Sequence, residues 1–510
     1  MSVSDTTPVL VGCGDITDQK TPVEAARSPY DLMAEAGRAA LADTGSGAVG
    51  AAIEAVAVVR LFAETSHRFR SGFGSSANPP ASLARRLGLR PSRLFYTWSG
   101  GNMPQSLVNR FAVSIARGEI RSVLIAGGEA LRTQRGLERA GLAADWREDP
   151  GGAPELIGDP RPGYNAHEEA HGLSAAIAFY PLIETAIRAA RGASPEAHLA
   201  AMAALMARLS SVAAANPLAT RRELLSAARL ARIDGGNRWI GYPYPRLMTS
   251  NAYVDQAAAL VMMSAGLARS LGIPSARWVH LHGCADCHDH WSLLDRPELH
   301  RSPAIRAGLS HAMAMAGRRS QDMAYLDLYS CFPSAIEVAC AEAGLAEDDA
   351  RGLTVTGGLP CFGGPGNNYV THSIAETMRR LRAAPGRFGL VSANGYYLTK
   401  HAFGIYSTSP PEHRPDYDSG GLQAELDGGP KAPFTQEPSG AARIESYAVM
   451  HATSGPALAI IVGREEASGR RFLANLDDGE PVPADMQQVD WLGRTGHVRR
   501  GEGRNLFAFA

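Results

Sequence analysis

The sequence has no long apolar run and no excess of charge of one sign. No 18 apolar residues follow one another in its 510 residues, and its start lacks the basic stretch and apolar core of a secretory signal. Lys plus Arg number 50 and Asp plus Glu number 51, which gives a formal net charge of -1. So small a charge does not attract nucleic acid or anionic lipid. We therefore expect a cytoplasmic protein without membrane contact, whose partners are small molecules or proteins.

Cysteine is also scarce. Six cysteines in a chain this long provide no disulfide framework, which fits a reducing compartment. Only Cys13 precedes Cys284. Chemistry that needs a thiol therefore cannot be performed by the residues between them.

What the chain does contain is an alternation of amphipathic, Ala-rich stretches with short β-branched runs. This βαβ rhythm is typical of a mostly parallel sheet with helices on its faces. In the first part we expect helices at 31–43 and 102–117 and strands at 54–60 and 121–126. Further apolar cores, strand or helix, lie at 256–263, 323–328 and 388–392.

Two stretches interrupt the alternation. Residues 135–245 begin Gly/Pro-rich and become long and Ala-rich, which indicates a helical excursion laid over a sheet. Residues 409–440 are rich in Pro, Gly and Asp and are typical of a linker. Beyond them, 443–475 has short alternating runs separated by turn residues, the pattern of a small β-barrel.

Several short motifs follow one another in a fixed order. They are the run SGGNMPQSLVNRFAVSIARGEIRSVLIAGGEAL from Ser99, Thr249-Ser250-Asn251 with Asp255-Gln256-Ala257-Ala258-Ala259, Tyr329-Ser330-Cys331-Phe332, Gly357-Gly358 through Gly363-Gly364-Pro365, and Ala393-Asn394-Gly395. In this order and spacing they resemble the thiolase superfamily, particularly the branch near the sterol carrier protein x thiolases. The likeness covers roughly residues 8–410.

The resemblance implies an α/β fold of five layers, αβαβα, built from two similar halves. It also implies a helical loop domain, a helix at 255–259, and, after residue 440, a module similar to the small OB-fold partners of some relatives. We expect an N-terminal half at 1–134 with part of 246–275, a loop domain at 135–245, a C-terminal half at 276–410, a linker at 411–440 and an OB-like domain at 441–510.

The resemblance also shows which catalytic groups are missing. Thiolases use a cysteine nucleophile, an activating histidine and a second cysteine that moves a proton. The nucleophile position falls here within Ser99 to Asn102, with Gly101 as the best match, and the other two fall at Gly364 and Ala393. Ser99 could replace the nucleophile only with an adjacent base, and the alternative is a tight turn whose backbone N–H groups form a carbonyl cradle. We expect Ser99, Gly100, Gly101, Asn102, Gly363, Gly364 and Asn394 to bind substrate.

Polar groups remain in the other motif loops. Tyr329 takes the place of a histidine, and Tyr369 and His372 follow the Gly-Gly-Pro loop. This pattern resembles thiolase-like retro-aldolases that use tyrosines as acid and base, although Ser330 replaces an aspartate of their motif. We take Tyr329, Tyr369 and His372 as catalytic candidates, with a satisfied core-edge tyrosine as the alternative for Tyr329.

Other candidate side chains have structural alternatives. Tyr396, Tyr397, Lys400 and His401 follow Asn394 and should partly line the pocket, unless they build a turn. Cys331 and Cys361 each adjoin a phenylalanine, which favours buried, inert thiols. The stretch 284–290 (CADCHDH) contains zinc-ligand types, but the chain has no matching second pair and the resemblance implies a strand and loop there. We expect no metal.

The sequence therefore predicts a thiolase-like enzyme, similar to acetyl-CoA acetyltransferases, that acts on a CoA thioester without a cysteine nucleophile or a separate cofactor. Retro-aldol cleavage of a β-hydroxyacyl-CoA and non-catalytic binding of acyl-CoA or lipid are the alternatives. A homodimer is the default for such a fold, and a C-terminal module that covers the interface would leave a monomer.

Overall fold

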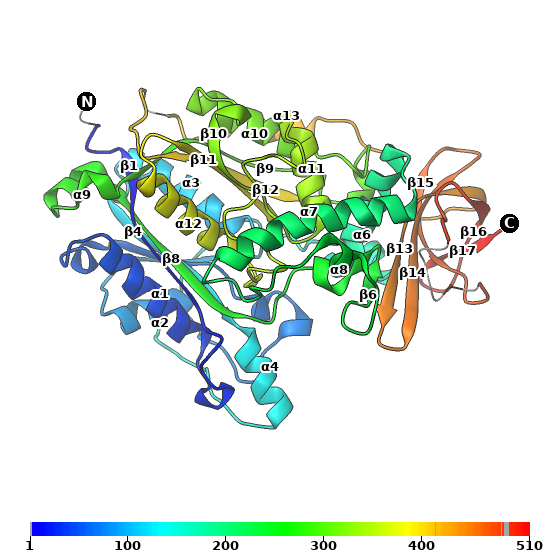
Figure 1. Cartoon of the computed structure of the whole chain (residues 1–510), viewed down its shortest axis with the longest axis horizontal. Coiled ribbons are helices and arrows are strands. Elements are labelled where there is room, and N and C mark those ends of the chain that lie inside the picture. The colour runs from blue at the N-terminus through cyan, green and yellow to red at the C-terminus, as the bar shows by residue number, and fades with distance from the viewer. Residues whose placement is uncertain (1–2, 414, 481, 484–488) are drawn as a thin grey trace.

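A computed structural model describes residues 3–413, 415–480, 482–483 and 489–510. Ten strands form one continuous order, β10-β11-β12-β9-β1-β8-β4-β2-β3-β5, in which β9 and β1 make only a short contact. The sheet therefore divides at β9 and β1 into two halves that face each other (Figure 1).

The two halves repeat the same topology. In the first half β1 pairs antiparallel with β8, β8 antiparallel with β4, and β4 parallel with β2; in the second, β9, β12, β11 and β10 pair in the same order and directions. The N-terminal elements are β1 (Pro8–Thr17), α1 (Pro29–Asp43), β2 (Ala55–Val58), α2 (Pro79–Leu87), β3 (Arg93–Thr97), α3 (Met103–Ala116), β4 (Ser122–Ala130), β8 (Asp255–Ser264) and α9 (Ala265–Ser270). The C-terminal elements are β9 (Val279–His288), α10 (Pro303–Ala316), β10 (Met323–Asp327), α11 (Pro333–Ala343), α12 (Tyr369–Ala383), β11 (Phe388–Gly395) and β12 (Lys400–Ser407).

Helices complete a five-layered arrangement. Helix α1 packs on β1 and β8, helix α10 packs on β9 and β12, and α3 and α12 lie between the two half-sheets and contact both (Figure 1). Each of the two central helices is covered from both sides. The expected αβαβα fold of two similar halves is confirmed.

One element differs from the expectation. The resemblance implied a helix at 255–259, but these residues begin strand β8, all ten residues of which are buried. A strand between two neighbours and between two helix layers is apolar on both faces, so its sequence has no period that distinguishes it from a buried helix.

The middle of the chain is the expected helical excursion. It contains α4 (Leu131–Ala140), β5 (Glu155–Ile157), α5 (Ala166–Ala170), α6 (Ala176–Arg191), α7 (Pro195–Ala215), α8 (Ala227–Ala231), β6 (Trp239–Tyr242) and β7 (Tyr244–Pro245). Within the described ranges, α7 alone is long and apolar enough to cross a membrane, but half of its apolar window is buried inside the protein. Packing in the core accounts for that composition.

The C-terminal region is a closed five-stranded barrel at one end of the molecule (Figure 1). Its strands pair in the order β13-β14-β15-β17-β16 and back to β13, as the OB-like prediction requires. Strand β6 of the excursion adds to β13, which joins the barrel to the rest of the protein. The elements are α13 (Leu422–Asp427), β13 (Gly440–Ala452), β14 (Gly455–Glu465), β15 (Arg471–Leu476), β16 (Thr495–Arg500) and β17 (Asn505–Phe509).

Candidate functional site

The turn between β3 and α3 is poor in side chains and rich in free backbone donors. Asn102 occupies the N-cap position of α3 but makes no side-chain hydrogen bond to the helix start. Within the described part of the chain, the N–H groups of Gly101 and Asn102 also make no hydrogen bond, whereas the N–H of Gly100 donates to Asn367 Oδ1 at 3.1 Å. A helix start with unpaired N–H groups favours a partly negative oxygen.

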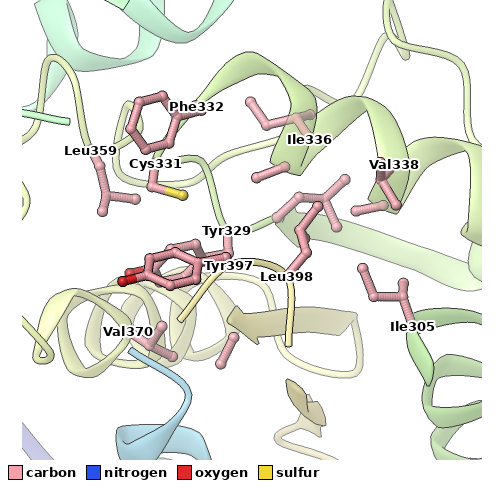
Figure 2. Close-up of a cluster of buried hydrophobic side chains, with 14 of the residues drawn as sticks. Ile305, Tyr329, Cys331, Phe332, Ile336, Val338, Leu359, Val370, Tyr397 and Leu398 are labelled. Atoms are coloured by element: carbon pink, nitrogen blue, oxygen red, sulfur yellow. The ribbon is translucent and has the colours of Figure 1, made fainter. Parts of the chain in front are cut away.

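Tyr329 closes this turn from the opposite half. A Cβ built on Gly101 would collide with the Tyr329 hydroxyl and lie 2.6 Å from the Asn394 carbonyl oxygen. The tyrosine is 8% exposed and sits among apolar side chains with Phe332 and Val370 (Figure 2). Its hydroxyl makes no hydrogen bond to any described residue, and burial raises its pKa well above the usual value. The group is therefore a protonated phenol, able to donate.

Two carboxamide oxygens near the turn have no donor. Asn102 Oδ1 and Asn394 Oδ1 are both buried and without a hydrogen-bond partner in the described structure. Asn394 is held in place by its amide, which donates to Tyr180 Oη at 2.7 Å. Buried acceptors without partners are rare and mark positions where a ligand donor would be favourable.

Lys400 completes the turn with a buried amine. Its Nζ donates to the Ser99 carbonyl oxygen, lies 4.1 Å from the centre of the Tyr396 ring, and would lie 2.9 Å from a Cβ at Gly100. Burial lowers the pKa of Lys400 to about 8. A fraction of this amine is therefore neutral near neutral pH and can accept a proton.

Tyr369 stands behind Tyr329 rather than in the turn. The two rings meet edge to face at 5.7 Å, and the Tyr369 hydroxyl is paired with Thr356 Oγ1 at 2.6 Å. Tyr369 is fully buried at the first position of α12. Its visible contribution is to support the ring of Tyr329.

His372, one turn further along α12, faces β1. Its Nδ1 lies 3.4 Å from Asp15 Oδ2, and Asp15 is also paired with Arg379. No described contact joins His372 to the turn at Gly101. A catalytic role for it stays a prediction.

The Gly-Gly-Pro loop is closed by side chains from β8 and from the segment before it. A Cβ at Gly363, where φ is +124°, would collide with Gln256, and a Cβ at Gly364 would collide with Ser250 Oγ. Gln256 Nε2 also donates to the Phe362 carbonyl oxygen at 3.1 Å. The space that an imidazole would need at Gly364 is therefore filled.

All six cysteines are free and buried, and burial raises the pKa of every one. Cys331, near Tyr329 in Figure 2, has its pKa raised to about 12. Cys284 and Cys287 on β9 donate to the carbonyl oxygens of Tyr417 and Ala304. Because the thiolate is the nucleophile and the metal ligand, none of these thiols is activated.

One buried cluster has metal-ligand types. Among described residues it is the single group of three, made of Glu184, His198 and Glu337. His198 Nε2 lies 2.5 Å from Glu184 Oε1, and Tyr244 donates to Glu184 Oε2 at 2.6 Å. Two ligands of one ion sit farther apart than 2.5 Å, so a shared proton explains this contact better than a metal.

The structure brings part of the expected site residues together at the turn. Ser99, Gly100, Gly101, Asn102, Asn394 and Tyr329 meet at the start of α3, whereas Gly363, Gly364, Tyr369 and His372 lie behind or beside it. Lys400, expected from the sequence to be among the residues that partly line the pocket, brings its amine to the turn. Its position shortly after Asn394 was the signal, but the sequence did not show that the amine is buried.

Comparison with known proteins relates the chain to solved structures. A monomeric SCP2-thiolase like protein type 1 from Mycobacterium smegmatis is 37% identical over 100% of both chains, with a TM-score of 0.84. Residues 421–503 match the family described as the thiolase-like protein type 1 additional C-terminal domain. No curated protein matches the sequence.

More distant structures share the fold. The Ltp2-ChsH2(DUF35) aldolase is 19% identical with a TM-score of 0.56, covering 79% of this chain and 98% of that one. The dimeric peroxisomal thiolase of Saccharomyces cerevisiae is 14% identical with a TM-score of 0.57, covering 80% of this chain and 99% of that one.

Proposed function

The chain belongs to the SCP2-thiolase-like protein type 1 family of the thiolase superfamily, and on that basis we propose that it acts on a CoA thioester without a cysteine nucleophile. One observation carries the proposal. The unpaired hydroxyl of Tyr329 occupies the space over Gly101 from which a nucleophilic side chain would project. The CoA of the substrate is the only cofactor the proposal needs.

The turn would then act through proton transfer rather than acyl transfer to sulfur. The thioester carbonyl oxygen would accept from the N–H groups of Gly101 and Asn102, where the positive end of α3 stabilises developing negative charge. Tyr329 would donate a proton, because its raised pKa keeps it protonated. Lys400, with a pKa of about 8, would accept one.

Retro-aldol cleavage of a β-hydroxyacyl-CoA is the specific reaction that these groups suit best. The base takes the proton of the β-hydroxyl, the Cα–Cβ bond breaks to leave an aldehyde or ketone, and its electron pair forms the enolate of the shorter thioester. Tyr329 then protonates Cα. The aldolase among the structural relatives and the fused barrel favour this reaction over thiolysis.

The test is to incubate purified protein with acetyl-CoA, acetoacetyl-CoA and a panel of β-hydroxyacyl-CoA esters and to identify products by mass spectrometry. Cleavage of hydroxyacyl esters, lost in Tyr329→Phe and kept in Tyr253→Phe, supports the retro-aldolase. Saturable calorimetric binding of CoA esters without turnover supports a non-catalytic acyl-CoA-binding protein instead. A covalent acyl adduct on Cys331 or Cys361 would overturn the cysteine-independent route.

We further propose that the protein is a monomer. Strand β5 pairs in parallel with β3, so that the sheet ends here in a strand of only 3 residues. The Mycobacterium smegmatis relative is described as monomeric and the yeast thiolase as dimeric. The longer strand β3 is already paired within the chain, and so short an edge strand offers few backbone groups to a second copy.

A further inference from the structure

The two central helices begin in matching ways. Asn102 precedes α3 and Asn368 precedes α12, and each reaches across to a glycine of the other half: a Cβ at Gly395 would collide with Asn102 Oδ1, and a Cβ at Gly127 with Asn368 Oδ1. Asn368 Nδ2 also donates to the Gly127 carbonyl oxygen at 2.6 Å. The start of α12 is thus the internal counterpart of the turn at Gly101.

This counterpart adjoins a cavity of about 400 Å³. Arg60, two residues after β2, lines it, just as Tyr329 lies two residues after β10 at the first turn. Gly366, two residues before Asn368, borders the lining residue Glu129, and a Cβ there would collide with Glu129 Oε1. The volume lies in the range of small-molecule sites, roughly 300–1,000 Å³.

Glu129 is an unusual residue in such a place. It is 2% exposed, and its Oε1 accepts from the Phe62 N–H at 2.7 Å. Its other oxygen makes no hydrogen bond to any residue that the structure describes. Because Glu129 lines the cavity, a partner from outside the chain can bind this oxygen.

The remaining lining offers donors. Arg60 donates through Nε to Thr97 and through Nη1 to Glu64, which leaves its Nη2 without a partner among the described residues. Tyr30 Oη accepts from the Ser76 N–H at 2.7 Å, so its own hydrogen remains free. Burial raises the pKa of Glu129 to about 8, so near neutral pH this carboxyl also donates.

We propose that this cavity is a second binding site, specific for the carboxylate of a small organic acid. Three residues with a donor left over, Glu129, Tyr30 and Arg60, line the same cavity, and an acceptor-rich monoanion matches them. A phosphate dianion would be repelled by the carboxylate of Glu64, and among the lining residues only Arg60 and Arg70 would offset this repulsion. The site is separate from the turn at Gly101, and Asn367 connects the two: its Oδ1 accepts from the Gly100 N–H and its Nδ2 donates to the Arg60 carbonyl oxygen.

The test is calorimetric titration of the purified full chain with acetate, butyrate and succinate, with inorganic phosphate as a separate arm. We expect saturable carboxylate binding that weakens about tenfold between about pH 6.5 and about pH 9, as Glu129 loses its proton. The charged or titratable groups that face Glu129 are Arg60, Arg70, Glu64, Tyr30 and Tyr96. Burial raises the pKa of Glu64 and of both tyrosines, and the tyrosines stay protonated over this range.

Two variants and a control make the outcome decisive. Glu129→Gln keeps a neutral donor and should bind carboxylate with no such pH dependence. Glu129→Leu should not bind carboxylate. The control Glu119→Gln changes an exposed residue elsewhere and should behave as wild type. If Glu129→Leu does not fold, the Gln variant still decides through its pH profile. Absence of carboxylate binding, equal affinity for phosphate, or an unchanged pH dependence in Glu129→Gln would overturn the proposal.

Discussion

Tyr329 and Gly101 share one space at the start of α3, the hydroxyl of the first filling the volume that a Cβ on the second would need. The two residues come from opposite halves of the fold. Each therefore constrains the other: glycine permits the phenol to lie over the turn, and the phenol excludes a side chain from it.

Substitution of Gly101 tests this packing. Gly101→Ala should lower the free energy of unfolding by about 1–3 kcal/mol, because the added methyl overpacks a closed site. Combining it with Tyr329→Phe should recover part of the loss, since the hydroxyl is the nearest obstacle. Urea denaturation measures both. Gly47→Ala, where a Cβ meets nothing within 4 Å, should change stability by less than about 0.5 kcal/mol, and strict additivity of the Gly101 and Tyr329 changes would contradict the packing.

Lys400 should give stability a characteristic pH dependence. The unfolded lysine keeps its proton to pH 10.5 and the native one releases it near 8, so between these values the unfolded state binds more protons. The stability of wild type relative to Lys400→Met should therefore rise from pH 8 to pH 10.5, by at most about 3 kcal/mol. Denaturation curves across this range measure it. For the exposed Lys431→Met, the difference in unfolding free energy from wild type should not change with pH. If the difference for Lys400→Met did not change with pH either, a buried amine would be contradicted.

Arg471 should be essential for docking of the barrel. It is fully buried on β15 and donates to the carbonyl oxygens of Leu294, Arg296 and Pro297 and to Glu445. Arg471→Met leaves these acceptors unpaired and should cost about 3–5 kcal/mol. Limited proteolysis should then release the barrel faster than in the exposed neighbour variant Arg470→Met. Equal cleavage rates would show that other contacts hold the barrel.

The oligomeric state follows from the short strand at the sheet edge. Because β5 already pairs with β3, light scattering after size exclusion should give the mass of one chain, 54.0 kDa, over a wide concentration range. A concentration-dependent shift to twice that mass would mean that β5 does not protect the edge.

Much of the fold could be predicted because spacing is a strong signal when many weak motifs keep their order. The αβαβα halves were predicted from that order, and the barrel from the short alternating runs at 443–475. The secondary structure of β8 could not be predicted correctly, because a strand buried on both faces has no hydrophobic alternation in its sequence. Strand β5, which ends the sheet, has only three residues, too few to show an alternation.

Less of the site than of the fold could be predicted from the sequence. The motif loops identified the turn and Tyr329, but not which way each side chain faces. Tyr369 and His372 are three residues apart on one helix, yet the first backs the turn and the second meets Asp15. Glu129 lies at the carboxyl end of the buried strand β4, directly after Gly127-Gly128, which is a signal for a site at a strand's end, but the cavity beside it depends on loops distant in sequence.

The central claim is that chemistry at this turn depends on a phenol and not on a thiol. The most direct measurement is turnover of β-hydroxyacyl-CoA esters by wild type, Tyr329→Phe and a variant with all six cysteines replaced by alanine or serine. We predict that the cysteine-free protein, if folded, keeps its activity and that Tyr329→Phe loses at least about a hundredfold. Activity that survives in Tyr329→Phe and disappears with the cysteines would contradict the account.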